Sequence, residues 1–425
     1  MKIKVFKFGG ASVKDADGFR NITDIILKFK NEGKRIAFVV SATGKTTNAL
    51  EKALSEAIEN KGQIIPTLEE IADNHIHIAS QLLTKPQSAI SEIQFIINRI
   101  KENLQNPLPE LYDKLYDTVI SEGERLSTLI LSEYFIEKNV DFHLEDARNI
   151  IKTNLSWREG EVNWKSTKEA IQRFTENVWT SRPGALFFTQ GFIGGGPNRE
   201  SVTLGREGSD YSAALLAAAL KAESLTIWKD VPGVFNADPK IFSDAVMFTR
   251  LSYENAIELA WYGATIIHPK TLFPLKNEGV PLFVKSFLSP ETPGTQIDNK
   301  PTSGLVPALI YKKNQILWTI NLTDGQFVNE KLLAEILKVI SENKIKINAL
   351  QETALELKLC MDFDKIRSNN ALIKLSKKFL ITEKKNIQLV TIINYSPALM
   401  QNILDNQKPY MEQRDSRIAR FVINE

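Results

Sequence analysis

The sequence predicts an α/β protein, a three-layer αβα sandwich in which helices cover both faces of a mainly parallel sheet. Residues 3–8 and 36–40 are continuous β-like runs, and between them apolar residues recur at helical spacing from Phe19 to Phe29. Both runs are mainly apolar and do not alternate, which is typical of strands buried on both faces between layers of helices. The same pattern continues to about residue 288.

Further elements of this first region follow in chain order. Residues 66–138 are mostly helical in pattern, and we expect breaks near Pro107 and Pro109 and around Gly123. Three more buried strands are expected at 185–192, 224–228 and 281–287, and an alanine-rich helix at 211–220.

The composition changes after Ser289. Prolines and glycines cluster between Pro290 and Pro307, which indicates a linker. We therefore divide the chain into a first domain at 1–295, a linker at 296–311 and a smaller α+β module at 312–425. In that module we expect strands at 315–321, 345–350, 355–361, 389–395 and 417–423, and helices at 330–343 and 398–404.

Composition and charge restrict the class of protein. Among 425 residues, 43% are hydrophobic and 24% charged, as in ordinary globular proteins. The net charge of +2 gives no reason to expect nucleic acid or a membrane as partner, so small ligands are favoured. Cys360 is the single cysteine, and no apolar run approaches the roughly 20 residues of a membrane span. We expect a cytoplasmic protein.

The first strand carries a lysine and ends in two glycines. Lys7 stands among apolar residues, and Gly9 and Gly10 follow it. Glycines let the backbone approach a phosphate oxygen, and a nearby lysine supplies the balancing charge. A lysine on an exposed edge strand is the alternative, but burial of an unpaired ammonium is costly, so a phosphate site is favoured.

A second polar segment reads Thr-Leu-Gly-Arg-Glu-Gly-Ser-Asp at 203–210. Arg206 and Asp210 carry opposite charges four positions apart, next to Gly208 and Ser209. A guanidinium suits a carboxylate and a carboxylate suits an ammonium, so the pair would bind a zwitterionic amino acid. A local ion pair at a helix N-terminus is the alternative.

Two further segments offer polar groups at expected strand and helix ends. Gly-Lys-Thr at 44–46 is not a P-loop, because the first glycine of that motif would fall on Val39. The loop is still placed for ligand binding after a parallel strand, although Ser41, Thr47 and Asn48 could equally cap the next helix. Glu122 and Glu124 could both lie in the first turn of a helix, and composition does not show which of them has a functional role.

The loop at 230–238 follows a buried strand and could wrap a nucleotide, although its Pro-Gly pair is also an ordinary turn signal. His268 is best explained as a hydrogen-bonded structural histidine, because no metal-ligand spacing is present.

Taken in order, these segments resemble the aspartate kinases (aspartokinases) of the amino acid kinase family. The matching segments begin at Lys7, Ser41, Gly123, Thr203 and Asp230, and end with Gly-Ala and His-Pro at 263–269. The resemblance implies the amino acid kinase (carbamate kinase-like) fold and ATP- and Mg²⁺-dependent phosphorylation of the β-carboxylate of L-aspartate. That reaction begins lysine, methionine and threonine biosynthesis.

The resemblance also assigns roles to single residues. Lys7 and Asp210 would be catalytic, Arg206 would hold a carboxylate of aspartate, Asp210 its ammonium, and Glu124 would help to orient it. Phosphate contacts would come from Gly9, Gly10, Ser12 and Ser41, further substrate contacts from Ser41, Thr47, Gly208 and Ser209, and nucleotide contacts from Lys7, Lys229, Asp230, Phe235, Lys240 and Thr265. No protein metal ligand is assigned.

Four positions depart from the family pattern: Ala11, Glu207, Lys229 and Thr265. Thr265 replaces a lysine that the family places near the nucleotide phosphates, and we hypothesise that Lys229 supplies the missing charge. Glu207 replaces a glycine and adds a negative charge beside the aspartate site, unless its side chain points to solvent.

The C-terminal region resembles the ACT (ferredoxin-like) regulatory domains of the same family, with a second repeat that is abbreviated. ACT pairing implies a homodimer. Lysine-inhibited relatives usually carry Val-Asp where Ile347 and Asn348 stand, so the identity of the regulatory effector stays open. Two other functions also stay open: a catalytically silent amino-acid-binding regulatory protein, and a sister kinase with another acceptor.

Overall fold

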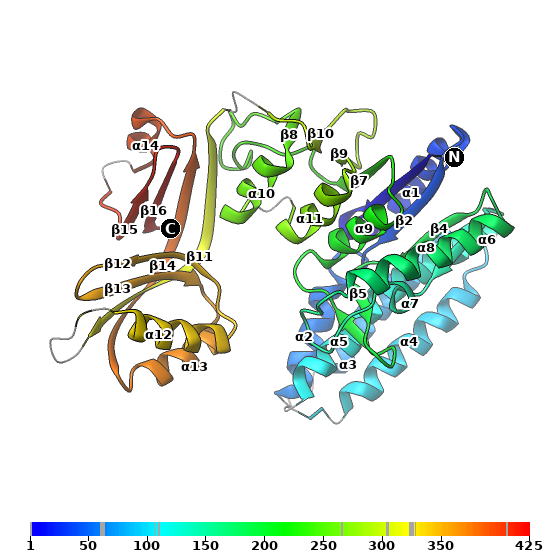
Figure 1. The fold of residues 1–425 in the computed structure, drawn as a ribbon. Helices are drawn as coiled ribbons and strands as arrows, with labels where there is room; N and C mark the ends of the chain where they lie inside the picture. Colours follow the sequence, from blue (N-terminus) through cyan, green and yellow to red (C-terminus); the bar gives the residue numbers. More distant parts are fainter. Residues whose placement is uncertain are drawn as a thin grey trace. The chain divides into compact units, whose positions relative to one another are not determined.

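The computed structural model describes residues 2–59, 64–105, 107–108, 111–264, 267–302, 306–322, 327, 329–404 and 407–425. The chain forms two compact units, each with its own sheet (Figure 1). The first comprises Met1–Val234, Met247–Ile257 and Ile266–Thr302, and the second Phe235–Val246, Glu258–Thr265 and Ser303–Glu425. None of the helices in the described ranges is long and apolar enough to cross a membrane.

The first unit is built on an eight-stranded sheet in the order β3-β4-β2-β1-β7-β9-β10-β8. Every pair of neighbours in it is parallel except β9 and β10, so the predicted mainly parallel sheet is confirmed. The strands are β1 (Ile3–Phe8), β2 (Arg35–Val40), β3 (Phe142–Glu145), β4 (Leu186–Gln190), β7 (Ser224–Lys229), β8 (Arg250–Ser252), β9 (Leu282–Ser286) and β10 (Thr295–Asp298).

Helices connect these strands, and a small hairpin, β5 (Ile193–Gly195) with β6 (Ser201–Thr203), lies outside the main sheet. The helices are η1 (Gly10–Val13), α1 (Ala16–Asn31), α2 (Thr46–Ile58), α3 (Ile64–Leu82), α4 (Gln87–Gln105), α5 (Tyr112–Ile120), α6 (Glu122–Glu137), α7 (Ala147–Ile150), α8 (Trp164–Ser181), α9 (Gly208–Ala219), α10 (Tyr253–Tyr262) and α11 (Pro269–Glu278).

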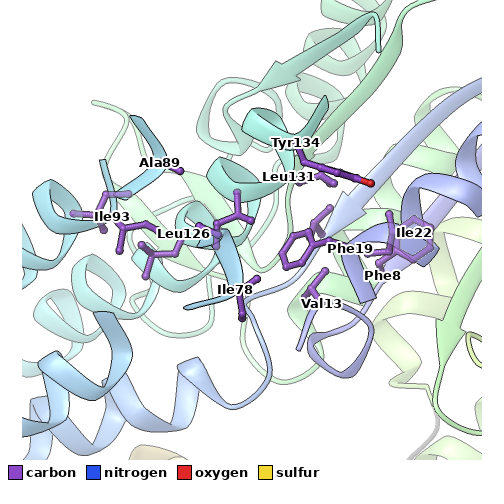
Figure 2. Close-up of a cluster of buried hydrophobic side chains, with 14 of the residues drawn as sticks. Phe8, Val13, Phe19, Ile22, Ile78, Ala89, Ile93, Leu126, Leu131 and Tyr134 are labelled. Carbon is purple, nitrogen blue, oxygen red and sulfur yellow. The ribbon is translucent and has the colours of Figure 1, made fainter. Parts of the chain in front are cut away.

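Alternate residues of each central strand face different helical layers. Phe6 and Phe8 join a core cluster with buried residues of α1, α2, α3, α4 and α6, and Figure 2 shows Phe8 beside Phe19 and Ile22 of α1. The neighbouring residue Lys7 instead lies against Asp210 of α9. Helices therefore cover both faces of the sheet, as the three-layer prediction requires.

The expected helix break around Gly123 is confirmed, because α5 ends at Ile120 and α6 begins at Glu122, although Gly123 itself lies inside α6. A Cβ built at Gly123 would lie 3.1 Å from the Cβ of Ala42. This glycine therefore lets α6 approach the loop after β2 rather than ending a helix. Helix α8 was not predicted, although Asn163 caps it by accepting a hydrogen bond from the Ser166 N–H.

The second unit contains a six-stranded antiparallel sheet in the order β12-β13-β11-β14-β16-β15, so the predicted α+β character is confirmed. Helix α13 was not predicted. The elements are β11 (Ala308–Leu322), α12 (Glu330–Glu342), β12 (Ile347–Glu352), β13 (Glu356–Asp362), α13 (Lys365–Leu375), β14 (Phe379–Ile393), α14 (Pro397–Leu404), β15 (Met411–Arg414) and β16 (Ile418–Asn424).

Two features of the chain differ from the predicted linker at 296–311. Residues 296–298 belong to β10 of the first sheet, and residues 308–311 begin β11 of the second. Strand β11 is long because it pairs with β14 along both of its halves, with register shifts between Lys312 and Leu317. Turn-forming residues near both ends of this segment hid the strand pairing from the sequence pattern.

Candidate active site

The candidate site lies in the first unit, where the central parallel strands β1, β2 and β7 end. Lys7 pairs in register with Val39 of β2 and Ile227 of β7, so the loops that follow these three strands begin at one edge of the sheet. Ligands of open α/β sheets bind at this edge.

A buried ion cluster forms at this edge. Lys7 Nζ lies 2.6 Å from Asp210 Oδ1, and Lys229 Nζ lies 3.3 Å from Asp210 Oδ2. Burial alone would raise the pKa of Asp210, but the charges of Lys7 and Lys229 outweigh it and hold this pKa below its usual value. Lys7 and Asp210 were each predicted to be catalytic, with separate roles, and the structure brings their side chains into contact.

The two glycines after β1, Gly9 and Gly10, have different structural roles. A Cβ built at Gly9 would lie 3.3 Å from Lys7 Nζ, with no other contact nearer than 4.0 Å. A Cβ at Gly10 would lie 2.8 Å from the Gly44 carbonyl oxygen and 2.9 Å from that of Ala42. Gly9 thus keeps space open beside the lysine, whereas Gly10 lets two loops pack together. Ser12 is buried in η1 directly after them.

The loop after β2 is held by backbone contacts. The Ser41 N–H donates to the Phe8 carbonyl at 3.1 Å, and Ser127 Oγ of α6 donates to the Ser41 carbonyl at 2.7 Å. The alternative that Ser41, Thr47 or Asn48 caps α2 is wrong, because Lys45 is the N-cap residue and makes no side-chain cap bond. Ser41 therefore lines this edge of the sheet as part of a fixed loop.

Glu122 and Glu124 differ in their hydrogen-bond partners. Glu122 Oε2 accepts hydrogen bonds from Arg99 at 2.5 Å and from Arg125 at 3.1 Å. Glu124 accepts one long bond, 3.4 Å, from the Ala42 N–H, and its buried Oε2 has no hydrogen-bond partner among the described residues. Burial raises the pKa of Glu124 to about 8, although the nearby charge of Lys7 lowers it.

The segment 205–210 leads into α9. Arg206 is exposed, whereas Gly208, Ser209 and Asp210 are buried in the first turn. A Cβ at Gly208 would lie 2.6 Å from the Phe192 ring, so this glycine permits close packing of the helix start. Glu207 does not point freely into solvent: it is half-buried, and its Oε2 is buried.

Comparison with known proteins agrees with the resemblance to aspartate kinases that the sequence motifs indicated. The amino acid kinase family model matches residues 2–286. Lysine-sensitive aspartokinase 3 of Escherichia coli (strain K12) is 31% identical over 405 residues, which cover 92% of this chain and 87% of the relative. The chain belongs to the amino acid kinase family, among the aspartokinases.

Other aspartokinases support this membership. The chloroplastic aspartokinase 1 of Arabidopsis thaliana is 30% identical over 399 residues, which cover 92% of this chain and 68% of the relative. The crystal structure of E. coli aspartokinase III in complex with aspartate and ADP (R-state) matches with a TM-score of 0.86 at 28% identity, over 100% of this chain and 96% of that one. Aspartate kinase of Clostridium acetobutylicum shares the fold, with a TM-score of 0.70 at 22% identity, over 99% and 96% of the two chains.

The residues that the aspartokinase resemblance assigns to the nucleotide are divided between the units. Lys229 ends β7 in the first unit and the exposed Asp230 follows it, whereas Phe235 and Lys240 belong to the second unit. Thr265 lies outside the described residues. The structure therefore leaves the nucleotide contacts of Phe235, Lys240 and Thr265 as predictions.

Several supporting residues of this aspartokinase fold were missed. His75 of α3 is buried, its Nδ1 lies 2.7 Å from the Ile71 carbonyl oxygen, and its Nε2 lies 3.5 Å from Thr46 Oγ1. No pattern in the sequence links His75 to the loop, whereas Ser127 could have been found from its three-residue spacing to Glu124. The structural reading of His268 is confirmed, because its Nδ1 accepts a hydrogen bond from the Lys270 N–H and caps α11.

Proposed function

We propose that this chain is an active aspartate kinase that transfers the γ-phosphoryl group of ATP to the β-carboxylate of L-aspartate. The single observation that carries the proposal is the buried Lys7–Asp210 pair beside the open space at Gly9. A lysine fixed next to such a space suits an incoming phosphoryl group. The membership among aspartokinases gives the acceptor.

The phosphoryl group would lie against Lys7 and the backbone N–H groups of Gly9 and Gly10, with Ser12 and Ser41 nearby. Asp210 fixes the ammonium group of Lys7 by the 2.6 Å contact, so the charge is in place before the substrate arrives. Lys7 and Asp210 therefore act together: Lys7 contacts the phosphoryl group, and Asp210 positions the ammonium group of Lys7.

For aspartate, we propose a different ammonium partner from the one that the resemblance suggested. Asp210 already contacts two lysines, so it is poorly suited to a third cation. Glu124 is buried, and its Oε2 has no hydrogen-bond partner in the described ranges, so a substrate ammonium would complete it. Arg206 stays our candidate for the α-carboxylate, with Thr47, Gly208 and Ser209 around the substrate.

The chemistry requires little beyond positioning and charge neutralisation. An oxygen of the β-carboxylate attacks the γ-phosphorus, the bond from this phosphorus to the bridging oxygen of ADP breaks, and ADP keeps the electron pair. The products are ADP and 4-phospho-L-aspartate. A carboxylate is already a nucleophile at neutral pH, so no general base is needed.

We treat Mg²⁺ as part of the MgATP substrate. In the described parts of the chain, no group of three or more His, Cys, Asp or Glu side chains could hold a metal ion, and Asp210 is engaged by lysines. Mg²⁺ commonly binds through few carboxylates and the substrate's phosphates, so these residues do not form a separate metal cage. Lys229, Asp230, Phe235, Lys240 and Thr265 remain the proposed nucleotide residues.

The family resemblance supports further proposals. We propose that residues 1–295 are catalytic, that residues 312–425 are regulatory, and that two copies pair through this C-terminal region. We also place the reaction at the entry to lysine, methionine and threonine biosynthesis in the cytoplasm. Aspartate and ATP are the proposed partners, without nucleic acid or a membrane.

The test is ATP-dependent acyl phosphate formation by the purified chain, trapped with hydroxylamine. L-aspartate is compared with L-glutamate and carbamate, and Asp210→Ala is the control. Hydroxamate from aspartate alone, lost in the control, is the expected result. Hydroxamate from another acceptor would favour a sister kinase, and aspartate binding without any product would favour a silent regulatory protein.

A further inference from the structure

Asp117 of α5 is a fully buried carboxylate that the proposed mechanism does not use. Both of its oxygens accept hydrogen bonds from outside its own helix. Thr203 Oγ1 of β6 donates to Oδ1 at 2.6 Å, and the Arg158 N–H donates to Oδ2 at 2.9 Å. Burial raises the pKa of Asp117 to about 6, although these hydrogen bonds lower it, so the group is mostly ionised at neutral pH. An ionised acceptor makes stronger hydrogen bonds than a neutral one.

The two segments that Asp117 holds meet at Gly205. Thr203 stands two positions before this glycine, and a Cβ built at Gly205 would lie 3.4 Å from the Arg158 carbonyl oxygen. Gly205 has a φ of 77°, where glycine is favoured, and Arg206 follows it. Asp117 therefore fixes both the chain that enters this turn and the loop that packs against it.

The loop at Arg158 needs to be held. Arg158 has a left-handed backbone with φ of 69°, which is uncommon for a residue with a side chain and persists only where the surroundings stabilise it. Its guanidinium lies over the Tyr116 ring, 4.5 Å from the ring centre, and its Nη1 lies 3.4 Å from Asp113 Oδ1. The side chain of Arg158 is thus anchored on α5, and its backbone N–H is anchored by Asp117 of the same helix.

Helix α5 is itself fixed to the first unit. Tyr116 Oη donates a hydrogen bond to Glu51 Oε1 of α2 at 2.5 Å. Helix α6, which carries Glu124 in its first turn, begins after a single intervening residue. Asp117 therefore connects the pair of helices that leads to Glu124 with the hairpin strand that leads to Arg206.

We propose that Asp117 is a positioning residue for aspartate binding, which fixes the turn that presents Arg206 to the α-carboxylate of the substrate. This inference rests on the proposed function, in which Arg206 and Glu124 bind the two charged groups at the substrate's Cα. Asp117 is fully covered by protein, so it acts through Thr203 and the loop at Arg158. A guanidinium binds a carboxylate through two parallel hydrogen bonds only in a narrow geometry, so displacement of this turn lowers affinity.

A positioning role predicts a change in KM that general destabilisation does not. Asp117→Ala should raise the KM for aspartate about tenfold and leave kcat and the KM for ATP within about twofold, because the phosphoryl site at Lys7 stays in place. Asp298→Ala is the matched control: Asp298 is also buried, and both of its oxygens accept hydrogen bonds from Arg250 at 2.7 Å. This control should lower thermal stability without raising the KM for aspartate, and an equal rise in both variants would overturn the proposal.

A gentler pair of variants decides the question if Asp117→Ala does not fold. Thr203→Val removes the hydroxyl group that Asp117 accepts, whereas Thr203→Ser keeps it. Thr203→Val should raise the KM for aspartate about three- to tenfold, and Thr203→Ser should stay within about twofold of the wild type. Equal KM values in the two variants would overturn the proposal, and thermal unfolding of each variant checks that it is folded.

The decisive experiment is a double-mutant cycle with Asp117→Ala, Arg206→Gln and the double variant, using kcat/KM for aspartate in the hydroxamate assay. Asp117→Ala should lower kcat/KM about tenfold when Arg206 is present and have no further effect on the Arg206→Gln background. Equal losses on both backgrounds would overturn the role of Asp117 while leaving the kinase function intact.

Calorimetry of aspartate binding repeats the cycle without turnover. If the wild-type chain bound aspartate but formed no product with any acceptor, the proposed function would fail, and the dissociation constants would still decide the role of Asp117. An approximately tenfold weaker binding in Asp117→Ala that disappears on the Arg206→Gln background supports the inference. Unchanged binding in Asp117→Ala would overturn it.

Discussion

Two polar clusters, one in each unit, differ in how completely their atoms are paired. In the second unit, Asp362 Oδ1 lies 2.8 Å from Lys312 Nζ and accepts hydrogen bonds from Asn348 at 2.7 Å and Gln315 at 3.0 Å. In the first unit, Glu124 Oε2 and Glu207 Oε2 are buried and have no hydrogen-bond partner within the part of the chain that the structure describes. A closed network stabilises a fold, whereas a buried oxygen without a protein partner can be completed by a ligand or by water.

The comparison also bears on regulation. Asn348 is fully engaged inside the second unit, because its Oδ1 accepts from Lys312 at 2.8 Å and its Nδ2 donates to Gln315 and Asp362. An amide with all these bonds has less capacity to bind an effector's ammonium than a carboxylate at the same position. We therefore interpret the cluster around Asp362 as structural, whereas Glu124 remains the proposed partner of the substrate ammonium.

The largest expected effect is that of Asp210→Ala. Loss of this carboxylate leaves Lys7 buried without its partner, so we expect kcat to fall about 10³-fold and the free energy of unfolding to fall by about 3 kcal/mol. The hydroxamate assay and urea unfolding measure the two effects. Asp362→Ala is the matched control in the other cluster, and comparable losses of kcat in both variants would contradict the distinction.

The next effect concerns Glu124. Glu124→Gln should raise the KM for aspartate about 10- to 100-fold, because a charge-assisted hydrogen bond to the substrate ammonium is lost. Glu122→Gln is the control, since Glu122 is already paired with Arg99 and Arg125. An equal rise of KM in both variants would remove the reason for choosing Glu124.

The raised pKa of Glu124 also predicts a pH dependence. The folded chain keeps a proton on Glu124 up to a pKa of about 8, whereas the unfolded chain loses it near 4.5. The contribution of this group to stability is therefore greatest below pH 4.5 and falls as pH rises to about 8. Thermal unfolding of Glu124→Gln should lack this slope, and a slope equal to that of the wild type would assign it to other groups.

The smallest expected effect is that of Gly9→Ala, which distinguishes the role of Gly9 from that of Gly10. Gly9→Ala places a methyl group 3.3 Å from Lys7 Nζ in a backbone with φ of −80°, which alanine adopts without strain. We expect kcat to fall about tenfold with stability unchanged within about 0.5 kcal/mol. Gly10→Ala should instead destabilise the fold, because its methyl group would meet two carbonyl oxygens at 2.8 and 2.9 Å. Similar unfolding curves for the two variants would show that the glycines are equivalent.

Much of the site could be predicted because it depends on local pattern. Lys7 in an apolar strand before Gly9 indicated a buried cation at a phosphate site, and the segment at 203–210 singled out Asp210. Glu124 and Glu122 could not be separated, because the partner that distinguishes them, Arg99, lies on another helix. Likewise, the contact of Glu207 with His268 joins two distant helix starts that no local pattern connects.

Prediction of the fold was limited in the same way, because contacts between distant parts of the chain leave no local sequence pattern. The buried strands of the first sheet were predicted because burial on both faces leaves a continuous apolar run. Helices α8 and α13 were missed, and β11 was predicted too short, because its first residues pair with β14 far along the chain. Long-range pairing of this kind decides where a strand starts, and local composition does not record it.

The central claim is that the incomplete carboxylate of Glu124 receives the ammonium group of aspartate. Its most direct test is calorimetry of aspartate binding at pH 7 in buffers that differ in ionisation enthalpy. With a pKa of about 8, Glu124 is mostly protonated at this pH, so binding of the ammonium should release close to one proton, and Glu124→Gln should release none. Aspartate binding without proton release in the wild type, or with equal release in Glu124→Gln, would contradict the claim.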